Sequence, residues 1–157
     1  MINPDTGEPW QLSDSTVAVD GRDRDRSAVS DVPKKSGPGG FFSRHHRQLR
    51  RSGNHSPANL VLLIGSGTSS EHGWMHRNVG VARVLGYIVE QHEDPAQVPV
   101  YRLDAYGMTY GWHLQTDDAQ LEPCPPPDRH PEEVITAALT LFDELKTGSR
   151  LTANRYL

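Results

Sequence analysis

Residues 59–64 read Asn-Leu-Val-Leu-Leu-Ile and contain the longest apolar run of the chain. A short continuous run of this kind is typical of a strand that is buried on both faces. A polar loop follows at residues 65–73, and from about residue 74 to residue 92 the apolar side chains take helical spacing. The run therefore predicts a buried strand that leads through a loop into a helix.

Two further strands and a second helix are expected downstream of this unit. Residues 98–106 read as a strand, and residues 108–115 alternate apolar and polar side chains, so the two predict a hairpin that turns near Gly107. After a Pro-rich connection at residues 117–129, Pro131 starts a helix that Gly148 is expected to end. The order β-α-β-β-α predicts an α+β domain in which two helices pack on a three-stranded sheet.

Upstream of the run, the first 56 residues contain few large apolar side chains, and these have no period. A segment of that composition cannot bury enough apolar surface to offset the entropy lost on ordering it. Apolar residues cluster only from Pro57 onward. The sequence therefore predicts a polar, largely disordered tail at residues 1–56 and a small α+β domain at residues 57–157.

Charge is divided between these two parts. The first holds nine basic and seven acidic residues, a net charge of +2, whereas the second holds seven and thirteen, a net charge of −6. A basic segment at residues 34–55 suggests a tail that contacts an acidic protein surface, RNA or DNA. The alternatives are a tail that keeps the chain soluble or one that folds back on its own domain. The candidate contact residues are Lys34, Lys35, Arg44, Arg47, Arg50 and Arg51.

Cysteine content and the N-terminus indicate the compartment. With Cys124 as the one cysteine, the chain forms no internal disulfide and no multi-cysteine zinc site. The N-terminus lacks the basic and apolar regions of a signal peptide, and the longest apolar run is too short to span a bilayer. We therefore expect a cytoplasmic protein with no membrane association.

The loop after the buried strand is a weak candidate for phosphate binding. Backbone amides and hydroxyls at a helix N-terminus can hold an anion, here those of Gly65, Gly67, Thr68 and Ser69. The loop lacks the lysine of a nucleoside-triphosphate loop, and its glycine spacing differs from the dinucleotide fingerprint. The favoured interpretation is an ordinary strand-to-helix turn whose hydroxyls cap the helix.

His72 and His76 are spaced as metal ligands on one helix face would be, with His92 or His113 as a further member. The zincin signature requires Glu directly after the first histidine, where this chain has Gly73. Because Gly73 can also leave His72 outside the helix, we expect surface or capping histidines and no metal site.

Aromatic side chains on the predicted hairpin offer a second contact surface. Tyr110 and Trp112 share one strand face and, if exposed, would stack on bases or anchor a partner. The alternation itself favours the other interpretation, in which they form the core beneath the helices.

The sequence contains no nucleophile–base pair, carboxylate pair or complete ligand set. The first hypothesis is therefore a small regulatory or adaptor protein, such as an accessory or phage-encoded factor, that binds another protein and carries no cofactor. The alternatives are a nucleic-acid-associated protein that uses the basic tail, and a phosphate- or nucleotide-binding enzyme that uses residues 65–70.

Overall fold

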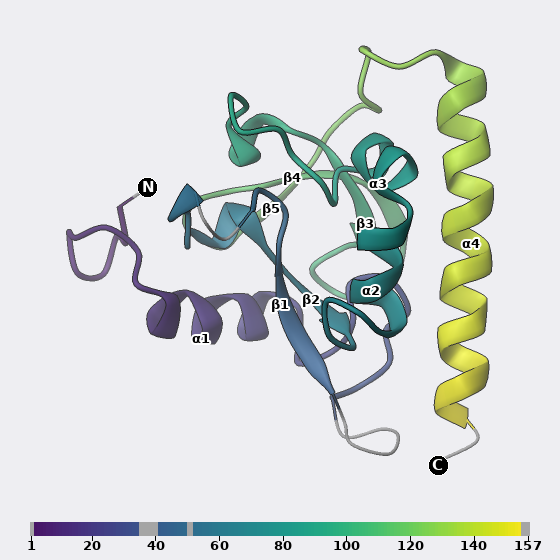
Figure 1. Ribbon diagram of the computed structural model, residues 1–157. Coiled ribbons are helices and arrows are strands. Elements are labelled where there is room, and N and C mark those ends of the chain that lie inside the picture. The colour runs from purple at the N-terminus through teal and green to yellow at the C-terminus, as the bar shows by residue number, and fades with distance from the viewer. Residues whose placement is uncertain (1, 35–40, 50–51, 155–157) are drawn as a thin grey trace.

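The computed structural model describes residues 2–34, 41–49 and 52–154, which form a mixed α+β fold (Figure 1). Within these residues there are four α-helices and two small antiparallel sheets of two and three strands. The elements are α1 Leu12–Arg22, β1 Phe42–His46, η2 Pro57–Asn59, β2 Leu60–Ile64, α2 Ser70–Arg77, α3 Val79–Leu85, η3 Pro95–Gln97, β3 Val100–Leu103, β4 Tyr110–Gln115, β5 Leu121–Pro123 and α4 Glu132–Asn154.

The apolar run at residues 60–64 forms β2, but its partner strand comes from the N-terminal segment. β1 pairs with β2 in an antiparallel register that places His45 opposite Val61. On the other edge of β2, Leu62 accepts a hydrogen bond from the Ala28 amide at 3.0 Å and donates one to the Asp23 carboxylate at 3.0 Å. Because both edges of β2 are occupied, β2 does not join the sheet that contains β3, and the predicted β-α-β-β-α topology is not observed.

The three-stranded sheet has the order β3-β4-β5. β3 and β4 form the expected hairpin, with Gly107 in its turn at a φ of +67°. β5 arises within the segment expected to be a plain connection, where Leu121–Pro123 pairs with the end of β4. The third strand of this sheet is therefore β5.

The helix expected at residues 74–92 is divided and shorter. α2 and α3 meet at Asn78, and α3 ends at Gly86, which has a φ of +89°. A Cβ atom on Gly86 would lie 2.1 Å from the Pro99 carbonyl oxygen. Only glycine therefore allows Pro99 to pack this close to the turn.

The C-terminal helix α4 begins as expected and continues past Gly148. Beyond that residue the Arg150 guanidinium donates to the Ser30 carbonyl at 2.9 Å and to the Tyr110 hydroxyl at 3.0 Å. These contacts offset the roughly 1 kcal/mol that a glycine costs within a helix. No helix in the described ranges has both the length and the apolar character needed to cross a bilayer.

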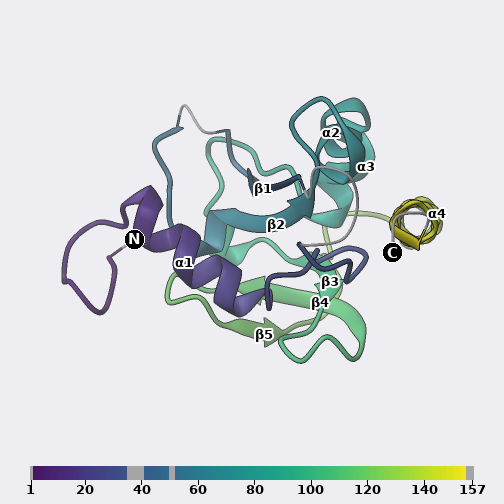
Figure 2. The same cartoon turned by 90° about the horizontal axis from the view of Figure 1, so that it is seen from below.

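The largest difference from expectation lies in residues 1–56, whose described part is built into the fold. α1 packs against β2, β1 pairs with β2, and Val19 and Val29 are fully buried. Figure 2 shows α1 beside the sheets, with α4 seen end-on at the opposite side of the molecule. In residues 2–34, 41–49 and 52–56 the structure therefore has ordered, packed segments where a largely disordered tail was expected.

Paired charges explain how the N-terminal segment packs into the fold despite its polar composition. The buried Asp23 carboxylate accepts from Arg22 Nε at 2.8 Å and from Arg102 of β3 at 2.6 Å. Arg22 also donates to the carbonyls of Pro57 and Leu60. Burial opposes ionisation, yet the guanidiniums of Arg102 and Arg22 outweigh it and hold the pKa of Asp23 well below its ordinary value. Polar side chains thus tie the N-terminal segment to the core.

Candidate metal centre

α2 carries two histidines on one face. His72 and His76 lie four residues apart, one helical turn, and their ring centroids are 4.9 Å apart. Gly73 between them is part of the helix, where an added Cβ would lie 2.6 Å from the Thr68 backbone. Gly73 therefore does not interrupt the helix, and its lack of a side chain lets the preceding loop pack close to α2.

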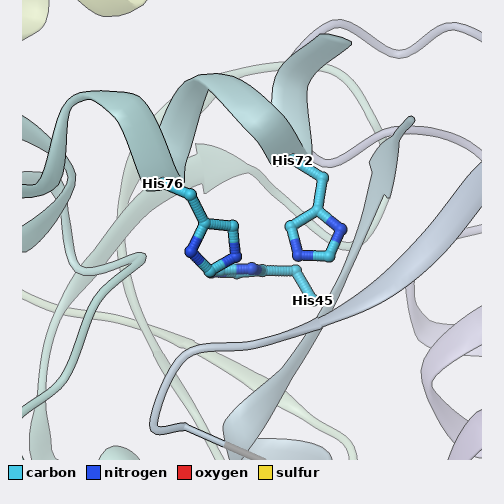
Figure 3. Close-up of side chains that lie close together, drawn as sticks. All are labelled: His45, His72 and His76. Carbon is cyan, nitrogen blue, oxygen red and sulfur yellow. The ribbon is translucent and has the colours of Figure 1, made fainter. Parts of the chain in front are cut away.

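β1 supplies a third histidine to the same place. The His45 ring is buried beneath α2, with its centroid 4.8 Å from that of His72 and 5.4 Å from that of His76. Figure 3 shows the two helix side chains descending toward His45. One ligand nitrogen from each residue lies within 4.8 Å of the others, and these three residues are the one such group within the described chain.

Hydrogen bonding fixes the tautomer of His45. Its Nε2 lies 2.6 Å from the Tyr87 carbonyl oxygen, which only accepts, so Nε2 carries the proton and donates it. The lone pair is therefore on Nδ1, which is buried and has no hydrogen-bond partner in the described structure. An unsatisfied acceptor at this depth is rare in proteins unless a ligand or an ion completes it.

A serine fixes the tautomer of His72 in the same way. The Ser43 hydroxyl has one proton and donates it to the Gly65 carbonyl at 2.6 Å. The same oxygen lies 2.5 Å from His72 Nδ1 and therefore accepts a proton from it. This leaves the lone pair of His72 on Nε2, free to bind an ion.

His45 and His72, the two inner histidines of the group, are both neutral near pH 7. Burial, followed by the neighbouring His72 ring, lowers the pKa of His45 well below its ordinary value. Burial, followed by His76 and His46, lowers the pKa of His72 to about 4. Neutral imidazole is the form that binds a metal ion, so the fold holds these two ligands in the required state.

The arrangement fits a transition-metal ion after a small adjustment. Tetrahedral coordination with Zn–N bonds of about 2.0–2.1 Å places ligand nitrogens roughly 3.3 Å apart. The present separations reach 4.8 Å, so the rings must close by about 1.5 Å at most. His76 is exposed and can supply this movement by rotation of its side chain.

Except for the buried Gly65, the phosphate-loop candidates lie on an exposed turn. Hydroxyls in the loop bond mainly to one another: Ser69 Oγ accepts from the Ser66 amide at 3.0 Å and lies 3.0 Å from Ser66 Oγ. Ser69 does not cap α2 with its side chain, which differs from the expected turn chemistry. Gly65, at a φ of +95°, ends β2, while Gly67 and Thr68 are exposed.

The basic candidates are placed differently from one another. Lys34 binds Asp20 and Asp25, and Arg44 also binds Asp20. Arg47 is 1% exposed and donates to four backbone carbonyls at 2.7–2.9 Å, so it is not available to a partner. Lys35, Arg50 and Arg51 lie outside the described residues.

The aromatic candidates belong to the core and its margin. Trp112 is buried, and Tyr110 is partly covered by α4, where the Phe142 ring lies 5.8 Å away from it. The Tyr110 hydroxyl donates to the Val29 carbonyl. Cys124 is partly buried, and burial raises the pKa of its thiol, which disfavours the reactive thiolate.

In comparisons with known proteins, no family model, curated protein or solved structure matches this chain. The assignment of a site therefore depends on geometry. The sequence singled out His72 and His76 but favoured surface or capping roles for them, and it placed His45 only within the basic segment at residues 34–55. No local signal connects His45 to a histidine 27 residues later, because only the pairing of β1 with β2 brings them together.

Proposed function

We propose that this protein binds one divalent transition-metal ion, Zn²⁺ in the first instance, through His45, His72 and His76. The observation that carries the proposal is the convergence of three imidazoles, of which the two inner ones have their proton-bearing nitrogens tied to fixed acceptors. Metal-ligating histidines usually donate their second nitrogen to such a partner.

The ligand set supports a transition metal over the common hard cations. Mg²⁺ and Ca²⁺ take oxygen ligands, and this site offers imidazole nitrogens. The carboxylate of Glu71, which precedes His72 in the sequence, is directed into the core, where it accepts from Ser27 Oγ at 2.6 Å and from the Ile64 amide at 2.9 Å. The site therefore suits Zn²⁺, Co²⁺, Ni²⁺ or Cu²⁺.

A bound ion would also act on the fold. The ligands come from β1 in the N-terminal segment and from α2 beyond β2, so one ion joins two segments that are distant in sequence. An ion that binds only the folded state raises its stability according to its concentration relative to the dissociation constant. Through that coupling, the concentration of the metal ion would regulate the stability of the folded protein.

Metal analysis of the loaded and desalted protein tests the proposal. Wild type should retain one Zn²⁺ per chain, and the double variant H72A/H76A should lose it because one ligand remains. H92A, which removes an exposed histidine outside the group, is the matched control and should retain the ion. Equal zinc in wild type and H72A/H76A would contradict the proposal.

A second candidate is partner binding by the β3–β4 loop. Tyr106 and Met108 are 81% and 80% exposed, and they project two large apolar side chains from one tip. Y106S/M108S should lose a protein partner that wild type and V17S both retain, where Val17 is an exposed apolar residue on α1. Retention of every captured protein by the loop variant would remove this candidate.

The nucleic-acid and phosphate alternatives stay predictions. A filter-binding titration from low to high salt tests the first, because phosphate contacts by basic residues weaken steeply with salt. Thermal shift with nucleotides and phosphate tests the second through the loop at residues 65–70.

A further inference from the structure

We propose that the ion held by His45, His72 and His76 keeps one coordination position open to solvent, and that this position binds hydroxide or a small monodentate anion. The proposal rests on the metal site proposed above and adds the class of ligand that completes it. Four-coordinate sites with three protein ligands take their fourth ligand from solution.

The ligand count is the first argument. The described residues place no fourth His, Cys, Asp or Glu within reach of the three histidines. The residues outside the described ranges, at positions 1, 35–40, 50–51 and 155–157, include none of these four residue types. The fourth ligand is therefore not one of the protein's usual metal-binding side chains.

Burial gives the open position a direction. His45 lies at the base of the group and is fully buried, His72 is intermediate, and His76 is exposed. The burial of the three rings thus decreases from His45 through His72 to His76. Figure 3 shows the rings of His72 and His76 above that of His45. An ion seated among them has protein beneath it and solvent on the side of His76.

Charge determines what enters from that side. Three neutral imidazoles leave the 2+ charge of the ion uncompensated. The side chains that shift the pKa values of His45 and His72 are the other histidines of the group, His46 and Arg47, and none of these is anionic. The Glu71 carboxylate is directed into the core, against Ser27 and the Ile64 amide. An anion is therefore the complementary fourth ligand.

Hydroxide is the simplest such anion. A water molecule bound to the ion loses a proton to the solvent more readily than free water, because the ion stabilises the oxygen lone pair that remains. A small anion such as azide or thiocyanate competes for the same position. The ligand class is thus small and anionic, with one donor atom.

Cobalt substitution of the full-length chain tests this inference separately from the metal site itself. Bound Co²⁺ gives visible absorption bands whose position and intensity report its coordination. Co²⁺ uptake is read first, with H92A as the control that should match wild type and H72A/H76A as the variant that should lose the bands. Azide and thiocyanate are then titrated into the Co²⁺-loaded wild type.

Saturable changes in the visible bands on addition of either anion are expected. A Co²⁺ spectrum that forms normally but does not change with azide, thiocyanate or rising pH would show a closed coordination shell and overturn the inference, while the metal site stands. Failure to take up Co²⁺ and Zn²⁺ alike would overturn both proposals.

Discussion

At the scale of single residues, the second nitrogen of each inner histidine defines the site. The Tyr87 carbonyl orients His45, and the Ser43 hydroxyl orients His72 while donating to Gly65. The first of these acceptors is a backbone group that no substitution removes. The second is a side chain, so Ser43 is the position at which orientation can be tested without removing a ligand.

We expect S43A to weaken Zn²⁺ binding by about 10–100-fold, the usual effect of losing a hydrogen-bond partner of a metal-ligating histidine. Without Ser43 Oγ, the His72 ring is free to change tautomer and rotate. Competition with a chelating dye measures the dissociation constant. S66A removes an exposed hydroxyl in the adjacent loop and should leave it unchanged; an unaltered constant in S43A would show that the serine does not position His72.

Asp23 makes the stability of the fold sensitive to acid. Its pKa in the folded state is held well below the ordinary value by Arg102 and Arg22, against the opposing effect of burial. At pH values below about 3.9 the unfolded state binds a proton that the folded state does not, so stability is present above that pH and is lost as the pH falls further. Urea unfolding between pH 7 and pH 2.5 measures the free energy.

The variant D23N provides the comparison for this pH profile. It leaves Arg22 and Arg102 without their shared carboxylate and should cost about 3–5 kcal/mol at pH 7. Its stability should change less than that of wild type between pH 5 and pH 2.5. Parallel profiles for the two proteins would assign acid sensitivity to other groups.

At the scale of elements, two glycines show that the effect of glycine on a helix depends on the surrounding packing. Gly86 ends α3 in a left-handed conformation against Pro99, whereas Gly148 lies within α4 with open space around its Cα. Gly148 was expected to end its helix and does not, whereas Gly86 ends α3 within the segment that was expected to be one helix at residues 74–92. The difference is tertiary, because Arg150 holds the last turns of α4 against Ser30 and Tyr110.

Alanine at these two positions should therefore act with opposite sign. G86A forces a Cβ to within 2.1 Å of the Pro99 oxygen at a positive φ and should destabilise the fold by more than about 1 kcal/mol. G148A should stabilise it by up to about 1 kcal/mol through helix propensity. Thermal unfolding of the two variants checks this, and a stabilising G86A would contradict the observed turn.

At the scale of the whole molecule, the N-terminal segment joins the two sheets. Ala28 donates to Leu62 of β2 and accepts from Leu103 of β3, each at 3.0 Å, so it lies between the sheets. Asp23 likewise binds both Leu62 and Arg102. The segment around residues 23–32 therefore lies between β2 and β3, two strands that were expected to belong to one three-stranded sheet.

Deletion of residues 1–34 should consequently abolish cooperative unfolding. It exposes the second edge of β2, removes the packing of α1 and leaves Arg102 buried without its carboxylate. The last change alone costs about 3–5 kcal/mol, a large part of the roughly 5–15 kcal/mol margin of a typical domain. Circular dichroism during heating measures the transition. A truncated chain that melts at the wild-type temperature would instead support a largely disordered tail.

Local patterns in the sequence determined those elements whose cause is local. The apolar run produced β2, the alternation at residues 108–115 produced β4 and its hairpin with β3, and the stripe after Pro131 produced α4. Helical spacing also placed His72 and His76 on one face. In each case the period of side chains along the chain matches the period of the backbone conformation.

Only the tertiary structure decided the partner of β2, the burial of Asp23 among arginines and the arrival of His45 beneath α2. These depend on contacts between segments that are far apart in sequence, such as Asp23 with Arg102 and His45 with His72. Composition counts a charged residue as a cost to folding, whereas a paired and hydrogen-bonded charge can be buried. The candidate metal centre arises from that packing, because two ligands come from a helix and the third from a strand formed by a segment with little apolar surface of its own.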